Sequence, residues 1–180
     1  MIWAIVAVAV ALVALVGWIY NGLVSARLRT REAWSAIDVQ LQRRASLIPN
    51  LVETVKGYAK FERETLTTVT EARGALNPAA GPRETARASD ALSGALQSLF
   101  AVAEAYPDLK ANQRFAQLQA DLADTENKIA FARNYYNGAV ELYNIKVQSI
   151  PGVLIAGALG FKPAEFFEAE PQAAAVPTTI

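Results

Sequence analysis

The first 26 residues carry no charged side chain, and Arg27, Arg29 and Arg31 then follow within five positions. A helix rises about 1.5 Å per residue, so about 20 apolar residues are needed to cross a hydrocarbon core of about 30 Å. The run from Ile2 to Tyr20 supplies nineteen such residues. We therefore predict that residues 1–26 form a single transmembrane anchor and that the arginines mark the water interface.

A cleaved secretory signal is the main alternative to an anchor. Such a signal has a charged n-region, a short apolar core and a small-residue cleavage site. Here no charged side chain precedes the apolar run, the run is longer than usual, and no clean A-x-A site ends it. A buried core helix fits less well because the run is apolar on every face. An uncleaved anchor is therefore favoured.

Residues at both ends of the anchor are those expected at membrane interfaces. Trp3 lies near one end, and Trp18 with Tyr20 lies near the other, as in the aromatic belts of membrane helices. Arg27, Arg29 and Arg31 are expected to contact lipid headgroups, at about 1 kcal/mol each. Lys and Arg favour the cytoplasmic side, so we expect the N-terminus outside and the bulk of the chain in the cytoplasm.

Composition narrows the possible partners and chemistry. The 17 basic residues equal the 17 acidic ones, which does not favour nucleic-acid binding. Nine basic and six acidic residues lie between Arg27 and Arg73, so the positive excess lies beside the membrane, where anionic lipid attracts it.

The chain contains no cysteine and no histidine. This removes thiol nucleophiles, imidazole bases, the usual zinc sites and the Glu-x-x-His motifs of di-iron bundles. Acidic pairs such as Asp121 with Asp124 or Glu126 resemble a solvated helix face. We expect no enzymatic activity, no cofactor and no metal.

Helical periodicity dominates residues 27–170, which we predict to be one all-α domain, a long antiparallel helical bundle that continues the anchor. One apolar stripe at three-and-four spacing runs through Ile37, Leu41, Ala45, Ile48, Val52, Val55, Ala59, Leu66 and Val69. Pro49 interrupts this stripe without shifting its phase, which favours a kink within one helix that ends near Gly74.

Two further helices are predicted after a Gly- and Pro-rich loop that ends at Pro82. One spans about 83–105, and Tyr106-Pro107-Asp108 breaks it, with Asp108 as a plausible N-cap for the next. The last helix reaches about Ser149 and has its own stripe at Phe115, Leu118, Leu122, Ile129, Ala132, Tyr136, Val140, Tyr143 and Val147. No alternating strand pattern occurs.

The predicted lengths do not match. At about 1.5 Å per residue the three soluble helices measure about 70, 33 and 60 Å. A simple reversal at each loop would leave part of the first or third helix unpaired. Three explanations are open: the kink at Pro49 is sharper than a mild bend, Pro107 is a kink and not a turn, or the unpaired helix surfaces contact other subunits.

The C-terminal part differs from the rest. Residues 150–161 are apolar and glycine-rich but too short to span a membrane, and Phe166 and Phe167 follow among glutamates. This part could dock on the bundle, lie on a membrane surface or bind another subunit. Residues 171–180 resemble a disordered tail.

Two polar clusters are candidates for binding. Arg43 and Arg44 could contact lipid phosphates or a partner's acids, or could form a solvated helix face with local ion pairs. Tyr136-Asn137 and Tyr143-Asn144 repeat at a seven-residue spacing. They could fix helix register, as a buried Asn does, or could line a polar ligand pocket.

Several sequence segments resemble those of the LemA family. They are Tyr20-Asn21 with Arg27, residues 33–41 with Arg43-Arg44, residues 47–52, residues 55–59, residues 106–111, residues 125–133, Tyr136-Asn137, Tyr143-Asn144, Gly160-Phe161 and residues 166–168. The resemblance covers nearly the whole chain. It implies a bacterial-type inner-membrane protein with one N-terminal helix and an all-α bundle, and it implies no reaction. A departure is Phe61, where the family often has histidine.

The leading hypothesis is a non-enzymatic membrane-anchored scaffold that self-associates and acts through protein contacts at the membrane surface. The second is an adaptor for a membrane peptidase or other membrane complex, binding through the Phe166-Phe167 tail. Phe161, Phe166 and Phe167 are candidates for binding a partner or lipid. The third is a small-ligand sensor, which requires a cavity in the bundle.

Overall fold

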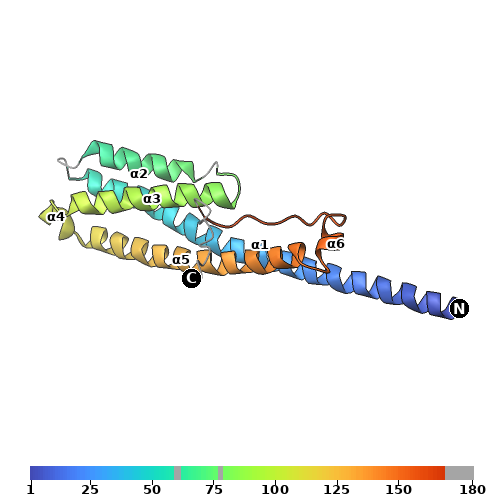
Figure 1. The fold of residues 1–180 in the computed structure, drawn as a ribbon. Helices are drawn as coiled ribbons and strands as arrows, with labels where there is room; N and C mark the ends of the chain where they lie inside the picture. The colour runs from blue at the N-terminus through green and yellow to red at the C-terminus, as the bar shows by residue number, and fades with distance from the viewer. Residues whose placement is uncertain (59–61, 77–78, 169–180) are drawn as a thin grey trace, which may run out of the picture.

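The computed structural model describes residues 1–58, 62–76 and 79–168. These residues form six helices and no strand (Figure 1). The helices are α1 (Ile2–Lys56), α2 (Arg63–Ala75), α3 (Pro82–Ala103), α4 (Pro107–Lys110), α5 (Gln113–Gln148) and α6 (Val153–Ala156). The all-α prediction is confirmed. The predicted tail at 171–180 and the departure at Phe61 lie outside the described residues.

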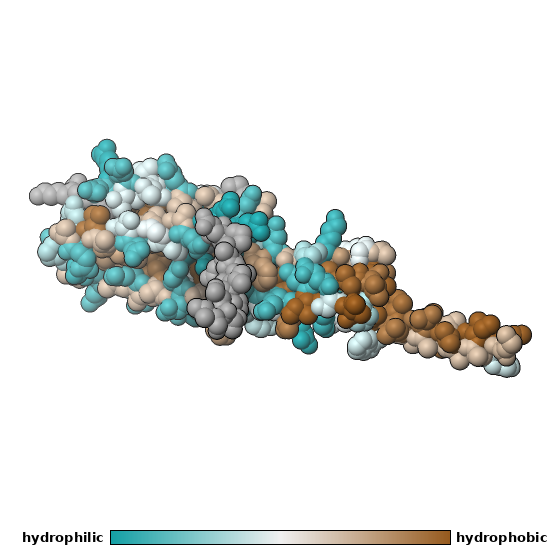
Figure 2. All heavy atoms as spheres, in the orientation of Figure 1, coloured by the Kyte–Doolittle hydropathy of each residue, from teal (hydrophilic) through white to brown (hydrophobic). Residues whose placement is uncertain are grey.

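Helix α1 is a single rod that leaves the bundle at its N-terminal end (Figure 1). Residues 1–18 are all exposed, and Ile19 is the first residue that packs against the rest of the chain. The apolar window near the N-terminus is long enough to cross a membrane. Figure 2 shows this end of α1 as a hydrophobic projection from a mainly hydrophilic bundle. The chain therefore carries one candidate membrane-spanning helix among its described residues.

Pro49 lies inside α1, as predicted, but the prediction of one helix to Gly74 is wrong. α1 ends at Lys56, and the chain reverses before α2 begins at Arg63. Proline lacks the N–H that would bond the carbonyl four residues earlier. That carbonyl, on Ala45, accepts a hydrogen bond of 2.8 Å from Nε of Arg73 on α2. The proline thus supplies a point where the returning helix attaches.

The end of α3 and the start of α5 also differ from prediction. The Tyr106-Pro107 break starts a single turn, α4, with Pro107 at its first position. The N-cap of α5 is Asn112, not Asp108, and its Oδ1 accepts from the Phe115 N–H at 3.1 Å. The predicted apolar stripe of α5 is confirmed, since all nine of its residues are buried.

The core runs along the whole bundle but changes its composition along the way. At the end far from the anchor, α1, α2, α3 and α5 together enclose the largest apolar cluster. Toward the anchor, α2 and α3 come to an end, and only α1 and α5 remain paired. There an extended segment, residues 161–168, returns along the bundle from α6 (Figure 1). We call this segment the strap.

Candidate functional site

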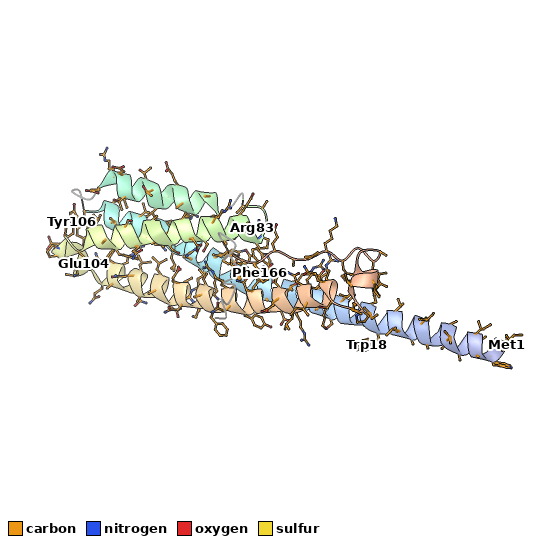
Figure 3. All side chains as sticks on the ribbon, in the orientation of Figure 1. Met1, Trp18, Arg83, Glu104, Tyr106 and Phe166 are labelled. Carbon is orange, nitrogen blue, oxygen red and sulfur yellow. The ribbon has the colours of Figure 1, made fainter. Side chains whose placement is uncertain are left out.

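The predicted membrane-interface residues lie where α1 leaves the bundle. Trp3 and Trp18 are 85% and 71% exposed, and Tyr20 is 44% exposed. Figure 3 shows Trp18 on the projecting part of α1 and Phe166 on the segment that lies over the bundle. Arg27, Arg29 and Arg31 are exposed about two to three turns beyond Tyr20 along α1. Their headgroup contacts remain a prediction.

Arg44 is fully buried at the point where α1, α3 and α5 meet. Its Nη1 donates to Oε2 of Glu126 at 2.6 Å and to Oγ of Ser93 at 2.8 Å, and its Nη2 donates to Oγ of Ser89 at 2.7 Å. Ser93 in turn donates to Oε1 of Glu126 at 3.0 Å. The guanidinium therefore links three helices through one charged network.

The expectation that Arg44 faces lipid, a partner or solvent is wrong. The stripe traced from the sequence passed through Ala45 and Val52, whereas the buried positions are Leu41, Arg44, Ile48, Leu51 and Val55. These follow the four-three spacing of a bundle seam, and Arg44 occupies one of its places. A heptad register in place of the looser stripe would have marked Arg44 as buried.

The neighbouring Arg43 keeps the position expected of a helix face. Its side chain is 42% exposed and lies 3.2 Å from Asp124. A hydrogen bond from Lys128 lowers the pKa of Asp124, and Arg43 contributes in the same direction. The ion pair between Arg43 and Asp124 thus joins α1 to α5. Asp38, which is closer to Arg43 in sequence, instead accepts a hydrogen bond from Gln42.

Two of the three acidic side chains considered for catalysis, Asp124 and Glu126, are used in these pairs. Asp124 is held by Arg43 and Lys128, and Glu126 by Arg44. Burial lowers the pKa of Arg44, and the negative charge of Glu126 opposes this effect. Within the described residues no group of three metal-ligating side chains comes together. The arrangement suits structural linkage of helices.

The two Tyr-Asn pairs of α5 bind the strap through its backbone. Asn144 forms two bonds with Ala164, donating to its carbonyl at 3.0 Å and accepting from its N–H at 2.8 Å. Asn137 accepts from the Phe167 N–H at 2.8 Å. The hydroxyl of Tyr143 donates to the Lys162 carbonyl at 2.9 Å. An extended segment has no internal backbone bonds, so these side chains satisfy groups that would otherwise be unpaired.

Tyr136 completes this set, because its hydroxyl donates to the Glu165 carbonyl at 2.9 Å. Burial raises the pKa of Tyr136 to about 12, and the Glu165 charge adds to the shift. The sequence predicts that the Tyr-Asn pairs fix helix register or line a ligand pocket, and neither prediction includes hydrogen bonds to the strap backbone. The seven-residue repeat did place both pairs on one side of the helix, but nothing in the pattern specified a partner from the same chain.

Two phenylalanines anchor the strap in the core. Phe161 is 5% exposed and Phe167 is fully buried. The Phe167 ring lies 5.9 Å from that of Trp34, and the Arg133 guanidinium lies 5.2 Å from its centre. Of the three phenylalanines predicted to bind a partner or lipid, only Phe166 is exposed, at 37%. Phe161 and Phe167 are buried inside this chain, so they leave little surface for a partner, and their binding stays a prediction.

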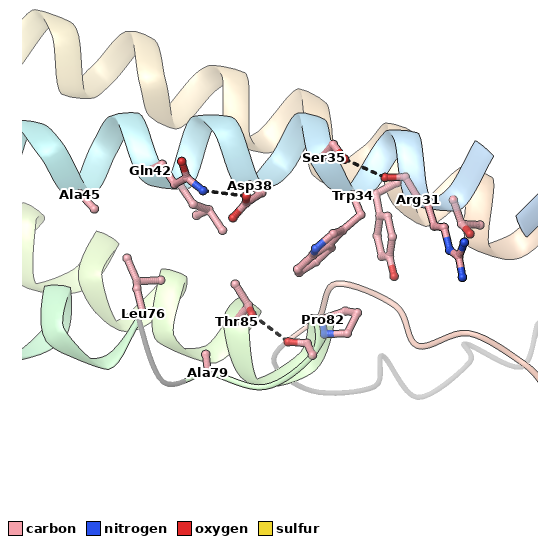
Figure 4. A pocket seen from close by; sticks show the side chains of 14 residues that line it. Arg31, Trp34, Ser35, Asp38, Gln42, Ala45, Leu76, Ala79, Pro82 and Thr85 are labelled. Carbon is pink, nitrogen blue, oxygen red and sulfur yellow. Dashed lines mark hydrogen bonds between the residues drawn. The ribbon is translucent and has the colours of Figure 1, made fainter. Parts of the chain in front are cut away.

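A groove of about 790 Å³ lies between α1 and the start of α3 (Figure 4). Three of its polar side chains donate to residues four positions earlier in the chain, and the hydroxyl of Tyr136, which also lines the groove, donates to the strap. Gln42 donates to Asp38 at 2.7 Å, Ser35 to the Arg31 carbonyl at 3.1 Å, and Thr85 to the Gly81 carbonyl at 2.8 Å. Their hydrogen-bonding capacity is thus partly used already. The groove gives little support to a ligand-sensing site.

A second apolar stripe lies on the outside of α5, close to the membrane end. We call it the α5 seam, and it consists of Phe131, Tyr135, Gly138, Leu142 and Ile145. Its four large side chains are 51–77% exposed. The steps of four, three, four and three residues are those of a coiled-coil seam. A groove of about 710 Å³ separates this part of α5 from Ser25, Ala26 and Arg29 of α1.

Removal of the buried arginine should destabilise the bundle far more than removal of its exposed neighbour. Arg44→Ala removes the guanidinium that neutralises Glu126 and binds both serines, and we expect the free energy of unfolding to fall by about 3–5 kcal/mol. Arg44→Met, which fills the site with an apolar chain, should lose less. Arg43→Ala, the matched control, should cost less than about 1 kcal/mol. Urea unfolding of the full chain in detergent, followed by circular dichroism, measures the differences. Equal losses for Arg44→Ala and Arg43→Ala would show that the network is not structural.

Loss of the asparagine contacts should release the strap while the bundle stays folded. Asn144→Ala removes both bonds to Ala164, and a buried group without its partner costs about 1–3 kcal/mol. Amide hydrogen exchange at Ala164 should therefore become faster, while exchange in the middle of α3 stays unchanged. Asn127→Ala, an exposed asparagine on the same helix, is the control. Unchanged exchange at Ala164 in the Asn144→Ala protein would show that Asn144 does not hold the strap in place.

Comparison with known proteins places the chain in a family. The model of the LemA family matches residues 33–179. Two relatives from Paramagnetospirillum magneticum, magnetosome proteins MamQ 1 and MamQ 2, are each 27% identical, over 84% of this chain and 65% of their own length.

A protein LemA from Metamycoplasma hominis is 28% identical, over 83% of this chain and 68% of its own. The chain thus spans about two thirds of the length of these relatives. The family match covers most of the chain, including the strap and both Tyr-Asn pairs, and the chain belongs to the LemA family.

Proposed function

We propose that this chain is a non-enzymatic membrane-anchored scaffold that self-assembles through the α5 seam. The observation that carries the proposal is a second apolar stripe at coiled-coil spacing on a helix whose first stripe is already buried in the bundle. Such a stripe on an exposed face marks a protein contact. A second copy offers the same stripe, and a two-fold arrangement would bury both.

The anchor strengthens this proposal. Copies held in one membrane meet at a raised effective concentration, so a short seam suffices for association. The α5 seam is about 21 Å long at about 1.5 Å per residue, and it lies in the half of α5 nearest the candidate membrane helix. Beyond it, Lys128 and Asp124 occupy the preceding seam positions and form their own ion pair at 2.8 Å. The apolar stripe therefore ends where charged side chains begin.

The other two hypotheses receive less support. An adaptor that captures a partner through Phe167 would first have to pull that ring out of the core, where it is fully buried. A ligand sensor would need free polar groups in the groove of Figure 4, but Asp38 and Thr85 already have partners there. The names of the relatives specify no reaction, which agrees with a structural role.

Crosslinking tests the self-assembly proposal directly, because the natural chain has no cysteine. Single variants Tyr135→Cys and Leu142→Cys, treated in membranes with a short bismaleimide, should give covalent dimers. Thr67→Cys, exposed on α2, should not. Adding Leu142→Glu to Tyr135→Cys should abolish the crosslink, because a buried unpaired charge is costly. Equal crosslinking at Thr67 and Tyr135 would point to random collision and would refute the seam.

The proposed location is the inner (plasma) membrane, with the N-terminus outside and the bundle in the cytoplasm. The cations that follow the candidate membrane helix support this orientation. In cells whose outer envelope is permeabilised but whose inner membrane is intact, a membrane-impermeant maleimide should label Ile2→Cys. The same reagent should label Thr67→Cys only after the cells are lysed. The reverse pattern would invert the topology and would leave the self-assembly proposal untouched.

A further inference from the structure

We propose that residues 149–161 form a second membrane contact, embedded in the lipid leaflet beside the point where α1 leaves the bilayer. We call this segment, which includes α6, the apolar hairpin. Its ligand is the acyl and glycerol region of the bilayer. The proposal depends on α1 spanning the membrane and does not depend on the α5 seam.

The composition of the apolar hairpin is the first argument. No charged residue occurs between Lys146 and Lys162. Despite this, the hairpin exposes large side chains: Ile150 is 79% exposed, Leu154 73%, Val153 47% and Leu159 41%. Single exposed apolar residues are ordinary, but a cluster on one short segment marks an interaction site.

The position of the hairpin identifies the partner. Ala156 and Phe161 of the hairpin pack with Ile19, Leu23 and Ala26 of α1. The Phe161 ring lies 5.9 Å from that of Tyr20 in an edge-on arrangement. The hairpin therefore lies beside the end of the nineteen-residue apolar run. Figure 2 shows a hydrophobic patch at this place that continues directly into the projecting part of α1.

Cations border this patch on the side away from the candidate membrane helix. Lys146 and Lys162 flank the hairpin in sequence, and the Arg27 guanidinium lies 5.9 Å from the centre of the Phe161 ring. The Lys146 ammonium is 3.4 Å from the Gly22 carbonyl, beside the groove between α1 and the hairpin. Long basic side chains at such a border reach lipid phosphates while their stems stay among apolar groups. This charge pattern matches an anionic lipid surface.

The hairpin has a fixed shape that suits such a contact. A Cβ on Gly152 would come within 1.9 Å of the Lys146 carbonyl oxygen, so only glycine allows the chain to turn this closely around the end of α5. Gly160 has a φ of +75°, which favours glycine. A groove of about 550 Å³ opens between Trp18 and Leu23 of α1 and Ile150 of the hairpin. Its lining is suitable for a lipid acyl chain.

Spin labelling of the full chain in vesicles tests this inference. Leu154→Cys and Ile150→Cys, each the only cysteine present, are labelled with a nitroxide and reconstituted in phosphatidylcholine and phosphatidylglycerol. Collision with oxygen, which concentrates in acyl chains, is compared with collision with a water-soluble nickel chelate. Leu12→Cys in the apolar run is the lipid control, and Thr67→Cys on α2 is the water control.

We expect Leu154 and Ile150 labels to resemble Leu12, with oxygen collision exceeding nickel collision. Nickel collision as frequent as at Thr67 would place the hairpin in water and overturn the inference. Low collision with both reagents together with dipolar broadening between labels would show a second copy in place of lipid, and would also overturn it. A label at Leu12 that behaves as in water would refute the spanning helix on which the inference rests.

Discussion

The continuity of α1 from the candidate membrane helix into the bundle constrains the rest of the molecule. α1 is one continuous helix from Ile2 to Lys56, so the candidate membrane helix and the first bundle helix form one rod. Anything that covers the bundle part of this rod has to run along it. α5 does so over most of its 36 residues. The pair formed by α1 and α5 is therefore the frame to which the other elements attach.

The lengths of the elements explain the strap. At about 1.5 Å per residue, α3 is about 33 Å long and α5 about 54 Å, so α2 and α3 cannot cover the whole pair. The uncovered part near the candidate membrane helix keeps an apolar side, formed by residues such as Trp34 and Ile37. The strap fills this place with Phe167 and is held by four side chains from α5. A length mismatch that could have required another subunit is thus met by an eight-residue segment of the same chain.

The charged side chain of Arg44 is buried between α1, α3 and α5. A buried ion pair recovers its desolvation cost only with good geometry and further hydrogen bonds, and here the serines of α3 and Glu126 of α5 supply both. An apolar residue could fill the same space without requiring a particular register. The network links α1, α3 and α5 in the same alignment in which Asn137 and Asn144 reach the strap.

Periodicity and composition in the sequence determined the helices, the candidate membrane segment and the buried stripe of α5. These features are local, because they follow from 3.6-residue spacing and from the cost of charge in lipid. Tertiary structure alone decided the reversal after Lys56, the burial of Arg44 and the partner of the Tyr-Asn pairs. Each of these depends on segments 20 to 82 positions apart. A pattern along one helix shows which side chains share a face, but it cannot show which distant backbone will satisfy them.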